Sequence, residues 1–423
     1  MSIHYLFPRI RHIDDVLPYI DEACFRVVEK DCGNTYINYV RMGDETFPPV
    51  PTEEEWLRAG DDQWELHNLD QEYQRAVIRR ECRGLVFDTA TGKLVSRPFH
   101  KFFNVGERED LDYDSLRFDS DAHVVQDKID GSMVRPIPTP LGMRWATKMG
   151  ITDVAMAAEA WLVDHPDYAE MASYYMQHGY TPLFEFTSPG TRIVVDYGVE
   201  PTMTLLAVRS NLDGGYLLQD ALENIGDRWG IPVVGTHPSF VTTPKAFVDA
   251  VKLSDLDEGI VIQWDNGHRV KVKTETYTIL HRVKEAARTE RTLVTAVLDQ
   301  SVDDLLPLLP TEDRAKVTKY IHTFWGCMDR LAIDVSALYT DARLTCASKK
   351  EFAISTAKTL TQLERAMVFG LWDNKILSPR AAAMLIIKGG LASETKWAEM
   401  KQKIEASAFR NFDTSWGSME VVE

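Results

Sequence analysis

The chain has 423 residues, of which 44% are hydrophobic and 10% aromatic, a composition that excludes a wholly disordered protein. Its net charge of −17 argues against a protein that coats nucleic acid through a broad basic surface. A binding site needs only a local basic patch, however, and one is found between Arg269 and Arg291. At about 150 residues per domain, the length predicts about two or three domains.

The sequence contains no signal for a membrane or for export. No run of residues approaches the roughly 20 apolar residues of a membrane helix, and the N-terminus lacks a basic stretch followed by an apolar core. The five cysteines are scattered and form no CxxC pair, which argues against a disulfide framework and against a zinc site. We therefore expect a cytoplasmic protein, located in the host cytoplasm if a phage encodes it, with no membrane partner.

Residues 1 to about 280 contain short apolar or alternating runs, separated by Gly, Pro, Asn and Asp, that are typical of strands. The first clear pattern is a hairpin at 84–99, with a turn around Gly92. Helical spacing is found near 151–178 and 219–229. Because helices and strands do not alternate regularly, we expect an α+β fold of mainly antiparallel sheets with flanking helices. The further strands are predicted at 124–137, 182–189, 191–197, 204–210, 258–264 and 268–274.

After about residue 285 the apolar residues recur at helical spacing. We therefore predict a first domain at 1–285, whose N-terminal part (1–115) contains the hairpin, and an all-α C-terminal domain at 286–423. Ser348 and the pair Ser378-Pro379 are suitable helix starts. The helices are predicted at 290–309, 314–339, 348–360, 361–372, 378–390 and 394–409.

The tetrapeptide KIDG at 128–131 places Lys128 at the end of an apolar strand, directly before a turn. Lysine is among the residues least often buried, so either this side chain reaches solvent or its amine acts there. An amine nucleophile must be neutral, whereas lysine ordinarily has a pKa of about 10.4. Partial burial and neighbouring cations, for which Lys271 and Lys273 are candidates, favour the neutral form. By itself the tetrapeptide leaves both interpretations open.

Two pairs of cations accompany this motif. Arg83 lies at the mouth of the predicted hairpin and Lys101 lies among apolar residues, so they could clamp phosphate oxygens or could form ordinary surface contacts. Lys271 and Lys273 are two apart in a predicted strand, so both ammonium groups project from one face. Two like charges side by side cost free energy unless an anion lies between them, which favours a binding role for this pair.

Two carboxylates also occupy unusual positions. Glu185 lies between Phe184 and Phe186, so it faces the opposite side of the sheet from the two phenylalanines. There it is either solvated or able to accept hydrogen bonds from the hydroxyls of a sugar. Glu258 precedes Gly259 at the start of an apolar strand, where it either forms part of a plain turn or binds a hard divalent cation such as Mg²⁺.

The order KxDG, then an EF strand, then EG opening a strand, then KxK is more specific than any of its parts. In this order the chain resembles the covalent nucleotidyltransferases, which include ATP-dependent DNA and RNA ligases and messenger-RNA capping enzymes. It is most similar to the bacteriophage-type tRNA-repair RNA ligases, the RNA ligase 1 family. The resemblance covers roughly residues 75–285 and rests on the segments ECRGLVFD, SRPFHKFFN, KIDGS, FEFTSPGTRIVV, LLAVR, EGIVI and VKVKTETYTILH.

The resemblance implies an ATP-dependent RNA ligase that uses Mg²⁺ or Mn²⁺. Lys128 would attack the α-phosphate of ATP to give lysyl-AMP, and the AMP would pass to an RNA 5′-phosphate. A 3′-hydroxyl would then displace AMP and seal the strand. The implied substrate is RNA with 5′-phosphate and 3′-hydroxyl ends, such as a cleaved tRNA anticodon loop, and an end-healing kinase/phosphatase would act in the same pathway.

The resemblance also implies roles for individual residues. Lys271 and Lys273 would hold the α-phosphate and act in catalysis, and Glu185 would hold the ribose. Glu258 and Asp130 are the candidate metal ligands. Arg83 and Lys101 would contact the outer phosphates of ATP, and Tyr39 would reach the triphosphate. Asp130, Gly131 and Ser132 would form the nucleotide loop. The other implied ATP contacts are Glu258, Tyr277 after the KxK strand, and Lys148, whose role stays open.

Two alternatives compete with this reading. DNA ligases and capping guanylyltransferases usually continue into a five-stranded barrel after the KxK strand, whereas this chain continues into predicted helices. A non-catalytic nucleotide- or RNA-binding protein is expected to lack Lys128 or the pair Lys271 and Lys273, and all three are present. The lysines of the helical domain could contact a folded RNA or form solvated faces; they are Lys349, Lys350, Lys396, Lys401 and Lys403.

Overall fold

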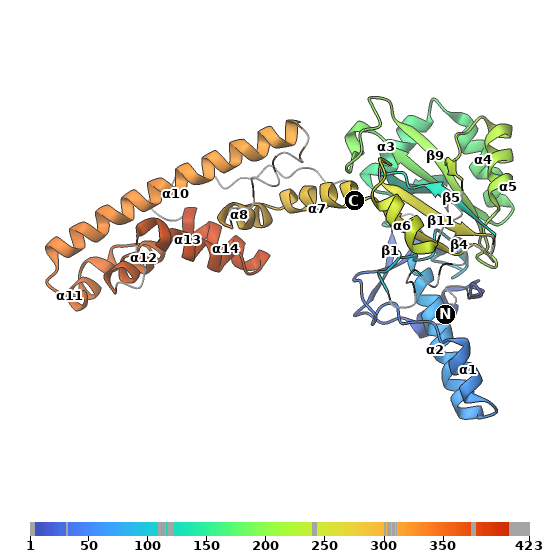
Figure 1. The fold of residues 1–423 in the computed structure, drawn as a ribbon, viewed down its shortest axis with the longest axis horizontal. Helices are drawn as coiled ribbons and strands as arrows, with labels where there is room; N and C mark the ends of the chain where they lie inside the picture. Colours follow the sequence, from blue (N-terminus) through green and yellow to red (C-terminus); the bar gives the residue numbers. More distant parts are fainter. Residues whose placement is uncertain are drawn as a thin grey trace. The chain divides into compact units, whose positions relative to one another are not determined.

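The computed structural model describes residues 5–405 apart from 31–32, 109–110, 112, 114–115, 117–121, 239–242, 300–301, 303–305, 307–308, 310 and 374–377. The chain divides into two compact units, one ending at Thr278 and one beginning at Ile279. This division falls within helix α7 (Glu275–Arg288), and the boundary predicted after residue 285 lies in the same helix. Figure 1 gives the order of the elements.

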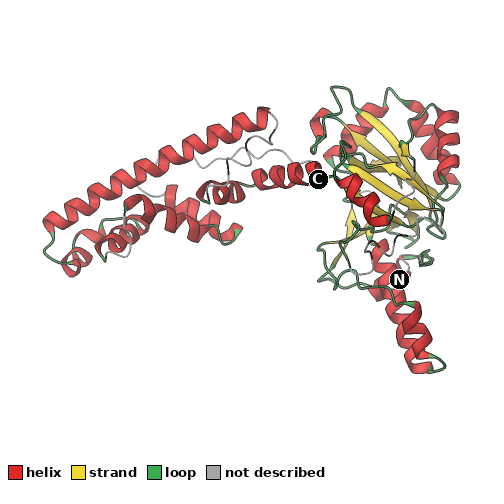
Figure 2. Ribbon diagram, viewed as in Figure 1, coloured by secondary structure: helices red, strands yellow, loops and turns green. Residues whose placement is uncertain are grey.

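Among the described residues, the first unit contains three four-stranded sheets in which all neighbouring strands are antiparallel (Figure 2). Their strand orders are β1-β2-β3-β4, β10-β5-β11-β12 and β7-β6-β8-β9. This confirms the expected α+β class. The strands are β1 (Phe25–Lys30), β2 (Asn34–Tyr39), β3 (Arg83–Asp88), β4 (Leu94–Ser96), β5 (His123–Asp127), β6 (Ser132–Thr139), β7 (Gly142–Ala146), β8 (Tyr180–Thr187), β9 (Thr202–Ser210), β10 (Thr236–His237), β11 (Gly259–Trp264) and β12 (Arg269–Lys273).

Helices cover one face of each sheet. The core between α3, α4, α5 and the sheet β7-β6-β8-β9 is made of apolar side chains, and α6 packs in the same way on β11 and β12. Helix α2 packs on β2 and β3. The helices of this unit are α1 (Glu53–Ala59), α2 (Gln63–Glu81), α3 (Asp153–Leu162), α4 (Pro166–Gln177), α5 (Gln219–Trp229) and α6 (Pro244–Lys252), with short 3₁₀ turns at Ile13–Asp15, Leu17–Tyr19 and Pro189–Thr191.

The alternation of side chains in the strands decides what the opposite faces carry. Phe184 and Phe186 are buried in the core under the helices, so Glu185 points to the other face of β8, as the sequence predicts. In β12, Val270 and Val272 are buried in the core with α6, whereas Lys271 is only partly buried. The polar faces of two sheets therefore remain free of helices and are available to form a site.

A buried ion-pair network joins three elements of the first unit. Glu81, the last residue of α2, lies 3.0 Å from Arg97 Nε and 2.8 Å from Arg209 Nη2, and all three side chains are 0% exposed. Arg97 follows β4 and Arg209 lies in β9. This network fixes the end of α2, and with it the start of β3 at Arg83, against β9 of the sheet β7-β6-β8-β9.

The strand predicted at 191–197 is wrong. In the structure this segment forms no strand, because its backbone N–H groups bind a side chain instead of a neighbouring strand. The N–H groups of Val194 and Val195 both donate to the carboxylate of Asp130 at 2.7 Å. The segment 124–137, predicted as one strand, forms two strands, β5 and β6, in different sheets, with the KIDG loop between them. The other predicted strands of the first unit and the hairpin formed by β3 and β4 are confirmed.

The second unit is helical throughout its described residues and has its own apolar core, so an all-α C-terminal region is confirmed. Ser348 and Ser378 cap helices through their hydroxyl groups, as predicted. The end of the last predicted helix, 406–409, lies outside the described residues. The helices are α7, α8 (Glu290–Leu298), α10 (Thr311–Thr345), α11 (Lys349–Ile354), α12 (Gln362–Trp372), α13 (Pro379–Gly390) and α14 (Glu394–Glu405), with a 3₁₀ turn at Thr356–Lys358.

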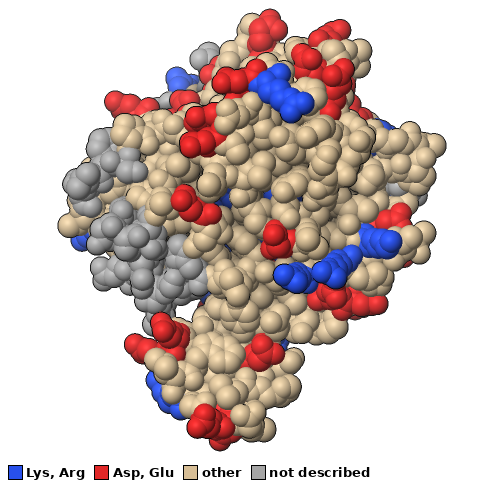
Figure 3. All heavy atoms as spheres, turned by 90° about the vertical axis from the view of Figure 1, so that its right-hand side faces the viewer, with Lys and Arg blue, Asp and Glu red and all other residues tan. Residues whose placement is uncertain are grey.

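Several global expectations can be compared with the structure. No helix within the described part of the chain has both the length and the hydropathy to cross a membrane. Four of the cysteines are free and buried, while Cys32 lies outside the described residues. One face of the molecule carries acidic side chains spread among neutral residues, with only small groups of basic ones (Figure 3). That face therefore provides no broad basic surface for nucleic acid.

Candidate active site

Lys128 directly follows β5 and is fixed there by the neighbouring strand. Its backbone N–H donates to the carbonyl oxygen of Gly259 at 3.0 Å. Gly259 has φ +139°, and a Cβ at this position would lie 2.1 Å from the carbonyl oxygen of Val272, so only glycine fits. The strand end that carries Lys128 is thus held close to the start of β11, where the EG motif lies.

The carboxylate of Glu258 lies between two ammonium groups. Its Oε2 is 2.7 Å from Lys128 Nζ and its Oε1 is 3.0 Å from Lys273 Nζ. The Glu258 side chain is only 3% exposed, whereas the two lysines retain about a quarter of their exposure. The structure therefore brings the lysine of KxDG together with the glutamate of EG and one lysine of KxK, which follow it by 130 and 145 positions in the sequence.

A cavity of about 260 Å³ opens beside Lys128, between the polar faces of the two sheets. Leu206 of β9 and Val261 of β11 supply apolar walls from opposite sheets, and Lys271 supplies an ammonium group. The lining also includes the predicted site residues Tyr39, Arg83, Lys101, Lys128, Gly131 and Glu185. Most of the predicted ATP contacts therefore surround one space.

The cations of this cavity are crowded and partly withdrawn from water. Burial, together with the like charges of Lys101 and Lys128, lowers the pKa of Lys271 to about 7. Burial also lowers the pKa of Lys101 to about 8, with Arg83 and Lys148 acting in the same direction. A buried group of like charges is stabilised by a bound anion.

Arg83 adds a second sign of an anion site. Its Nη1 is buried and has no hydrogen-bond partner among the described residues. A buried N–H without a partner costs free energy, typically about 1–3 kcal/mol. Because this group belongs to a cavity lined by Lys101 and Lys271, phosphate oxygens are the acceptors that would satisfy it.

Glu185 faces the same cavity from β8, where it pairs with Met133 of β6 and Thr204 of β9. Burial raises the pKa of Glu185 to about 8; the charge of Lys128 opposes this shift and that of Glu258 adds to it. At neutral pH the protonated carboxyl can donate one hydrogen bond and accept others. Such a group suits the hydroxyls of a sugar.

Asp130 is a hub of hydrogen bonds. One oxygen accepts from Val194 and Val195, and the other accepts from the hydroxyl of Tyr277 at 2.7 Å. The Asp130 N–H donates to the hydroxyl of Tyr197 at 2.9 Å. These contacts hold the KIDG loop, the segment 191–197 and α7 together. The role of Asp130 as a metal ligand stays a prediction, because three donors already occupy its carboxylate.

Gly131 is required by close packing. A Cβ there would lie 2.6 Å from the carbonyl oxygen of Phe186 and 3.0 Å from Glu185 Cγ. The loop after Lys128 therefore passes directly against β8, which brings the nucleophile candidate and the ribose candidate Glu185 to one place. Ser132 begins β6, paired with Phe186.

Of the predicted ATP contacts Tyr39 and Lys148, only Tyr39 lines the cavity. Tyr39 lines it, and its ring lies 5.9 Å from Lys101 Nζ and 5.5 Å from Lys148 Nζ. Lys148 itself does not line the cavity. Gly84 allows β3 to approach Lys148, since a Cβ on Gly84 would lie 3.0 Å from Lys148 Cα.

Sequence reasoning missed several residues of the site. Gln126 and Arg269 line the cavity, and each lies two positions before a predicted site lysine in the same strand or strand end, so strand alternation could have found both. Asp127 lines it as well and lies 2.6 Å from His237. Nothing in the sequence near His237 signals this pair.

The described residues contain no group of three or more His, Cys, Asp or Glu side chains placed to hold a metal ion. A magnesium site in a nucleotide enzyme usually needs only one or two carboxylates, because water and the substrate's phosphates supply the other ligands. The oxygen atoms of Glu258 are of the type that Mg²⁺ and Mn²⁺ prefer.

Known proteins share the segment that forms this site. The model of the RNA ligase family matches residues 81–277. This segment is similar to the RNA ligase family over just under half of the chain. It includes KxDG, the EF strand, EG and KxK, so the family match and the geometry concern the same residues. The described residues after β12 form helices joined by short connections.

The curated relatives of this chain differ in how much of their length they share with it. A "putative RNA ligase" of Thermovibrio ammonificans is 34% identical over 145 residues, 34% of this chain and 37% of that protein. A "putative bifunctional polynucleotide kinase/RNA ligase" of Autographa californica nuclear polyhedrosis virus is 27% identical over 54% of this chain and 35% of that protein. This chain thus spans little more than a third of the length of these two relatives.

A third relative matches more of both chains. The "RNA ligase 1" of bacteriophage TS2126 is 25% identical over 330 residues, which covers 77% of this chain and 79% of that protein. Among solved structures, an archaeal ATP-dependent RNA ligase aligns with a TM-score of 0.39 and 13% identity, over 62% of each chain.

Proposed function

We propose that this protein is an ATP-dependent RNA ligase that works through a lysyl-AMP intermediate on Lys128. One observation carries the proposal: the Lys128 amine lies beside a cavity whose partly buried cations include Lys271 and Arg83, and Arg83 Nη1 has no hydrogen-bond partner among the described residues. A nucleoside triphosphate would neutralise these charges and bring its α-phosphorus to the amine. The match of residues 81–277 to the RNA ligase family supports the same assignment.

The first step forms the enzyme–AMP bond. The base of ATP would lie between Leu206 and Val261, and its ribose would bind Glu185. The Lys128 nitrogen then bonds to the α-phosphorus, the bond from that phosphorus to the bridging oxygen breaks, and pyrophosphate leaves. The Lys128 ammonium group loses one proton to solvent before the attack and a second after it, and the nitrogen bonded to phosphorus keeps the third. Lys271 and Lys273 would stabilise the charge that develops on the phosphate oxygens, because such transfers depend mainly on positioning and electrostatics.

The later steps join the RNA ends. An RNA 5′-phosphate oxygen bonds to the phosphorus of lysyl-AMP, and the bond to Lys128 breaks. The 3′-hydroxyl of the other end then attacks the activated 5′-phosphate and AMP leaves. Arg83 and Lys101, which first grip the outer phosphates, would hold the incoming 5′-phosphate after pyrophosphate has gone.

A divalent metal ion fits this site through Glu258. When bound, Mg²⁺ or Mn²⁺ would neutralise phosphate charge next to the amine. Glu258 already binds the ammonium groups of Lys128 and Lys273, so its carboxylate balances cations at this place. Tyr39, Lys148 and Tyr277 would act around this centre, with Tyr277 holding Asp130 in position.

The proposed substrate is RNA with 5′-phosphate and 3′-hydroxyl ends, and repair of a cleaved tRNA anticodon loop is its proposed setting. Nuclease breaks often leave other ends, so an end-healing kinase/phosphatase would act before this protein in the pathway. The viral relative, whose name combines a polynucleotide kinase with an RNA ligase, supports the pairing of a kinase with this protein. The proposed location is the cytoplasm, where such RNA is found.

The test uses the purified full chain with ATP, Mg²⁺ and a short single-stranded RNA that carries a 5′-phosphate and a 3′-hydroxyl. We expect circular RNA, and we expect RNA-adenylate to accumulate when the RNA has a blocked 3′ end. The same RNA with a 5′-hydroxyl should stay linear. Sealing of DNA ends alone, or guanylate transfer from GTP, would contradict the proposal and favour a DNA ligase or a capping enzyme.

A further inference from the structure

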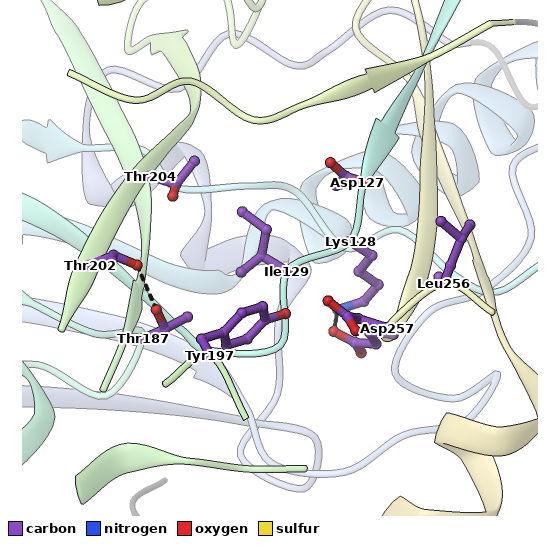
Figure 4. A pocket seen from close by; sticks show the side chains of 11 residues that line it. Asp127, Lys128, Ile129, Thr187, Tyr197, Thr202, Thr204, Leu256 and Asp257 are labelled. Atoms are coloured by element: carbon purple, nitrogen blue, oxygen red, sulfur yellow. Dashed lines mark hydrogen bonds and ion pairs between the residues drawn. The ribbon is translucent and has the colours of Figure 1, made fainter. Parts of the chain in front are cut away.

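A second cavity, of about 290 Å³, also borders Lys128 but has a different wall (Figure 4). Three threonines of β8 and β9 form one side of it, and charged residues from the end of β5 and from the segment before β11 form the other. Asp127, Lys128 and Ile129 line both cavities. A ligand in this second cavity therefore approaches the amine of Lys128 from another side than a nucleotide in the first.

The wall of the second cavity is rich in hydroxyl groups. The hydroxyls of Thr187 and Thr202 are 2.7 Å apart, and that of Thr204 makes no hydrogen bond with any described residue. The hydroxyl of Tyr197 accepts a bond from Asp130 N–H, which leaves its own proton for a ligand. Donors and acceptors are therefore offered together, the threonines from the paired strands β8 and β9 and the tyrosine from the segment 191–197.

The charge of this cavity is opposite to that of the nucleotide cavity. Among the described residues that line it, Lys128 is the one cation, against the carboxylates of Asp127, Asp257 and Glu258. His237 already pairs with Asp127, and Glu258 pairs with two lysines, whereas Asp257 makes no ion pair within the described part of the chain. Phosphate is repelled by such a wall, and a neutral group with several hydroxyls suits it.

We infer that the second cavity binds the 3′-terminal ribose of the RNA strand that accepts the new bond, an inference that rests on the proposed ligase function. This ribose is the one sugar of an RNA chain whose 3′ oxygen carries no phosphate. An internal sugar would bring a 3′-phosphate against Asp257, which disfavours it. Because the second cavity borders Lys128, a ribose bound there would place its 3′-hydroxyl close to the phosphorus atom that reacts in the first cavity.

The sealing step follows from this placement. The 3′ oxygen of the bound ribose bonds to the 5′-phosphorus of the adenylated strand, the bond from that phosphorus to the AMP phosphate breaks, and AMP leaves with the electron pair. The 3′-hydroxyl proton is lost to water. The hydroxyls of Thr204 and Thr202 and the Asp257 carboxylate bind the neighbouring 2′-hydroxyl, the group that distinguishes RNA from DNA.

The experiment isolates the sealing step in the full-length protein. Thr204→Val removes one hydroxyl and keeps a β-branched side chain suited to a strand, and Thr204→Ser restores the hydroxyl. With pre-adenylated RNA as donor, we expect Thr204→Val to raise the KM for an RNA acceptor about tenfold, the effect of one lost hydrogen bond. An acceptor with a 2′-deoxy terminal sugar should be sealed equally by Thr204→Val and wild type, and Thr204→Ser should recover the wild-type KM.

Asp257→Asn, with Asp255→Asn as its matched control, tests the other wall. Asp255 is exposed and does not line the cavity, so only Asp257→Asn should raise the KM for the acceptor. If Thr204→Val sealed the RNA acceptor with a wild-type KM, or if it lost lysyl-AMP formation to the same extent as sealing, this inference would be overturned while the proposed function would stand. A wild-type protein that forms no lysyl-AMP would overturn the proposed function, and this inference with it.

Discussion

Lys271 shows at the scale of one residue how the cavity is prepared for its ligand. Burial and the like charges of Lys101 and Lys128 hold its pKa at about 7, and the pKa of Lys101 lies at about 8. Only the protonated forms neutralise phosphate. We therefore expect the ATP affinity of the non-reacting Lys128→Ala variant to fall about tenfold between about pH 6 and about pH 9, as followed by titration calorimetry.

The sign of this pH effect can be checked from the groups themselves. Both lysines have lowered pKa values in the free protein, so they lose charge as the pH rises through about 7 and about 8. Glu185, with a pKa of about 8, gains a negative charge over the same range, which also weakens triphosphate binding. Adding Lys271→Arg, which stays charged, should flatten the profile. An affinity that rises with pH would contradict the account.

Gly131 gives a second prediction for a single residue. Its missing Cβ lets the loop after Lys128 pass 2.6 Å from the Phe186 carbonyl oxygen, so Gly131→Ala must displace the loop or the strand. We expect the free energy of unfolding to fall by about 1–3 kcal/mol, together with loss of lysyl-AMP formation. Urea unfolding and ATP labelling measure the two effects. Gly190→Ala is the control, because no atom lies within 4 Å of its Cβ, and it should change neither.

Between elements, Asp130 joins the KIDG loop, the segment 191–197 and α7. Asp130→Asn keeps the size of the side chain but leaves one acceptor oxygen where two now bind three donors. We expect a loss of about 1–3 kcal/mol in stability and faster proteolysis within 191–197, measured by urea unfolding and limited digestion. Asp196→Asn, at an exposed ion pair in the same segment, should have little effect. If the two variants had equal stability and equal rates of proteolysis, the Asp130 carboxylate would not be what holds these three segments together.

The same elements show what the sequence could and could not predict. Strands such as β8 and β12 were predictable, because alternation of apolar and polar residues records which face is buried. The order of the motifs pointed to Lys128, Glu185 and Glu258, and the structure brings these together. The segment 191–197 was mispredicted despite its β-branched residues, because distant Asp130 takes its backbone N–H groups. Long-range contacts of this kind leave no local pattern.

At the scale of the whole molecule, the two units have separate apolar cores. The core of the helical unit draws its residues from Leu293 onward, and the cores of the first unit contain none of them. Helix α7 starts with the residues that hold Asp130, so it belongs with the site at its N-terminal end. We expect a chain ending at residue 289 to fold and to form lysyl-AMP, as measured by circular dichroism and ATP labelling.

The truncated chain also separates catalysis from RNA choice. Two of the lysines predicted as candidates for RNA contact form ion pairs within the helical unit: Lys349 pairs with Asp373, and Lys401 pairs with Glu290. The role of that unit in RNA recognition stays a prediction. A truncated chain that is folded but takes no label would show that the helical unit is needed for the first chemical step.

The central claim is that Lys128 accepts AMP. The most direct measurement incubates the full-length protein with Mg²⁺ and ATP labelled at the α-phosphate, denatures it, and maps the labelled residue by mass spectrometry. The account predicts label on Lys128 that pyrophosphate removes, no label in Lys128→Ala, and normal label in the control Lys93→Ala, whose side chain is exposed and far from the motif in sequence. Label that persists in Lys128→Ala, or a wild-type protein that takes none, would contradict it.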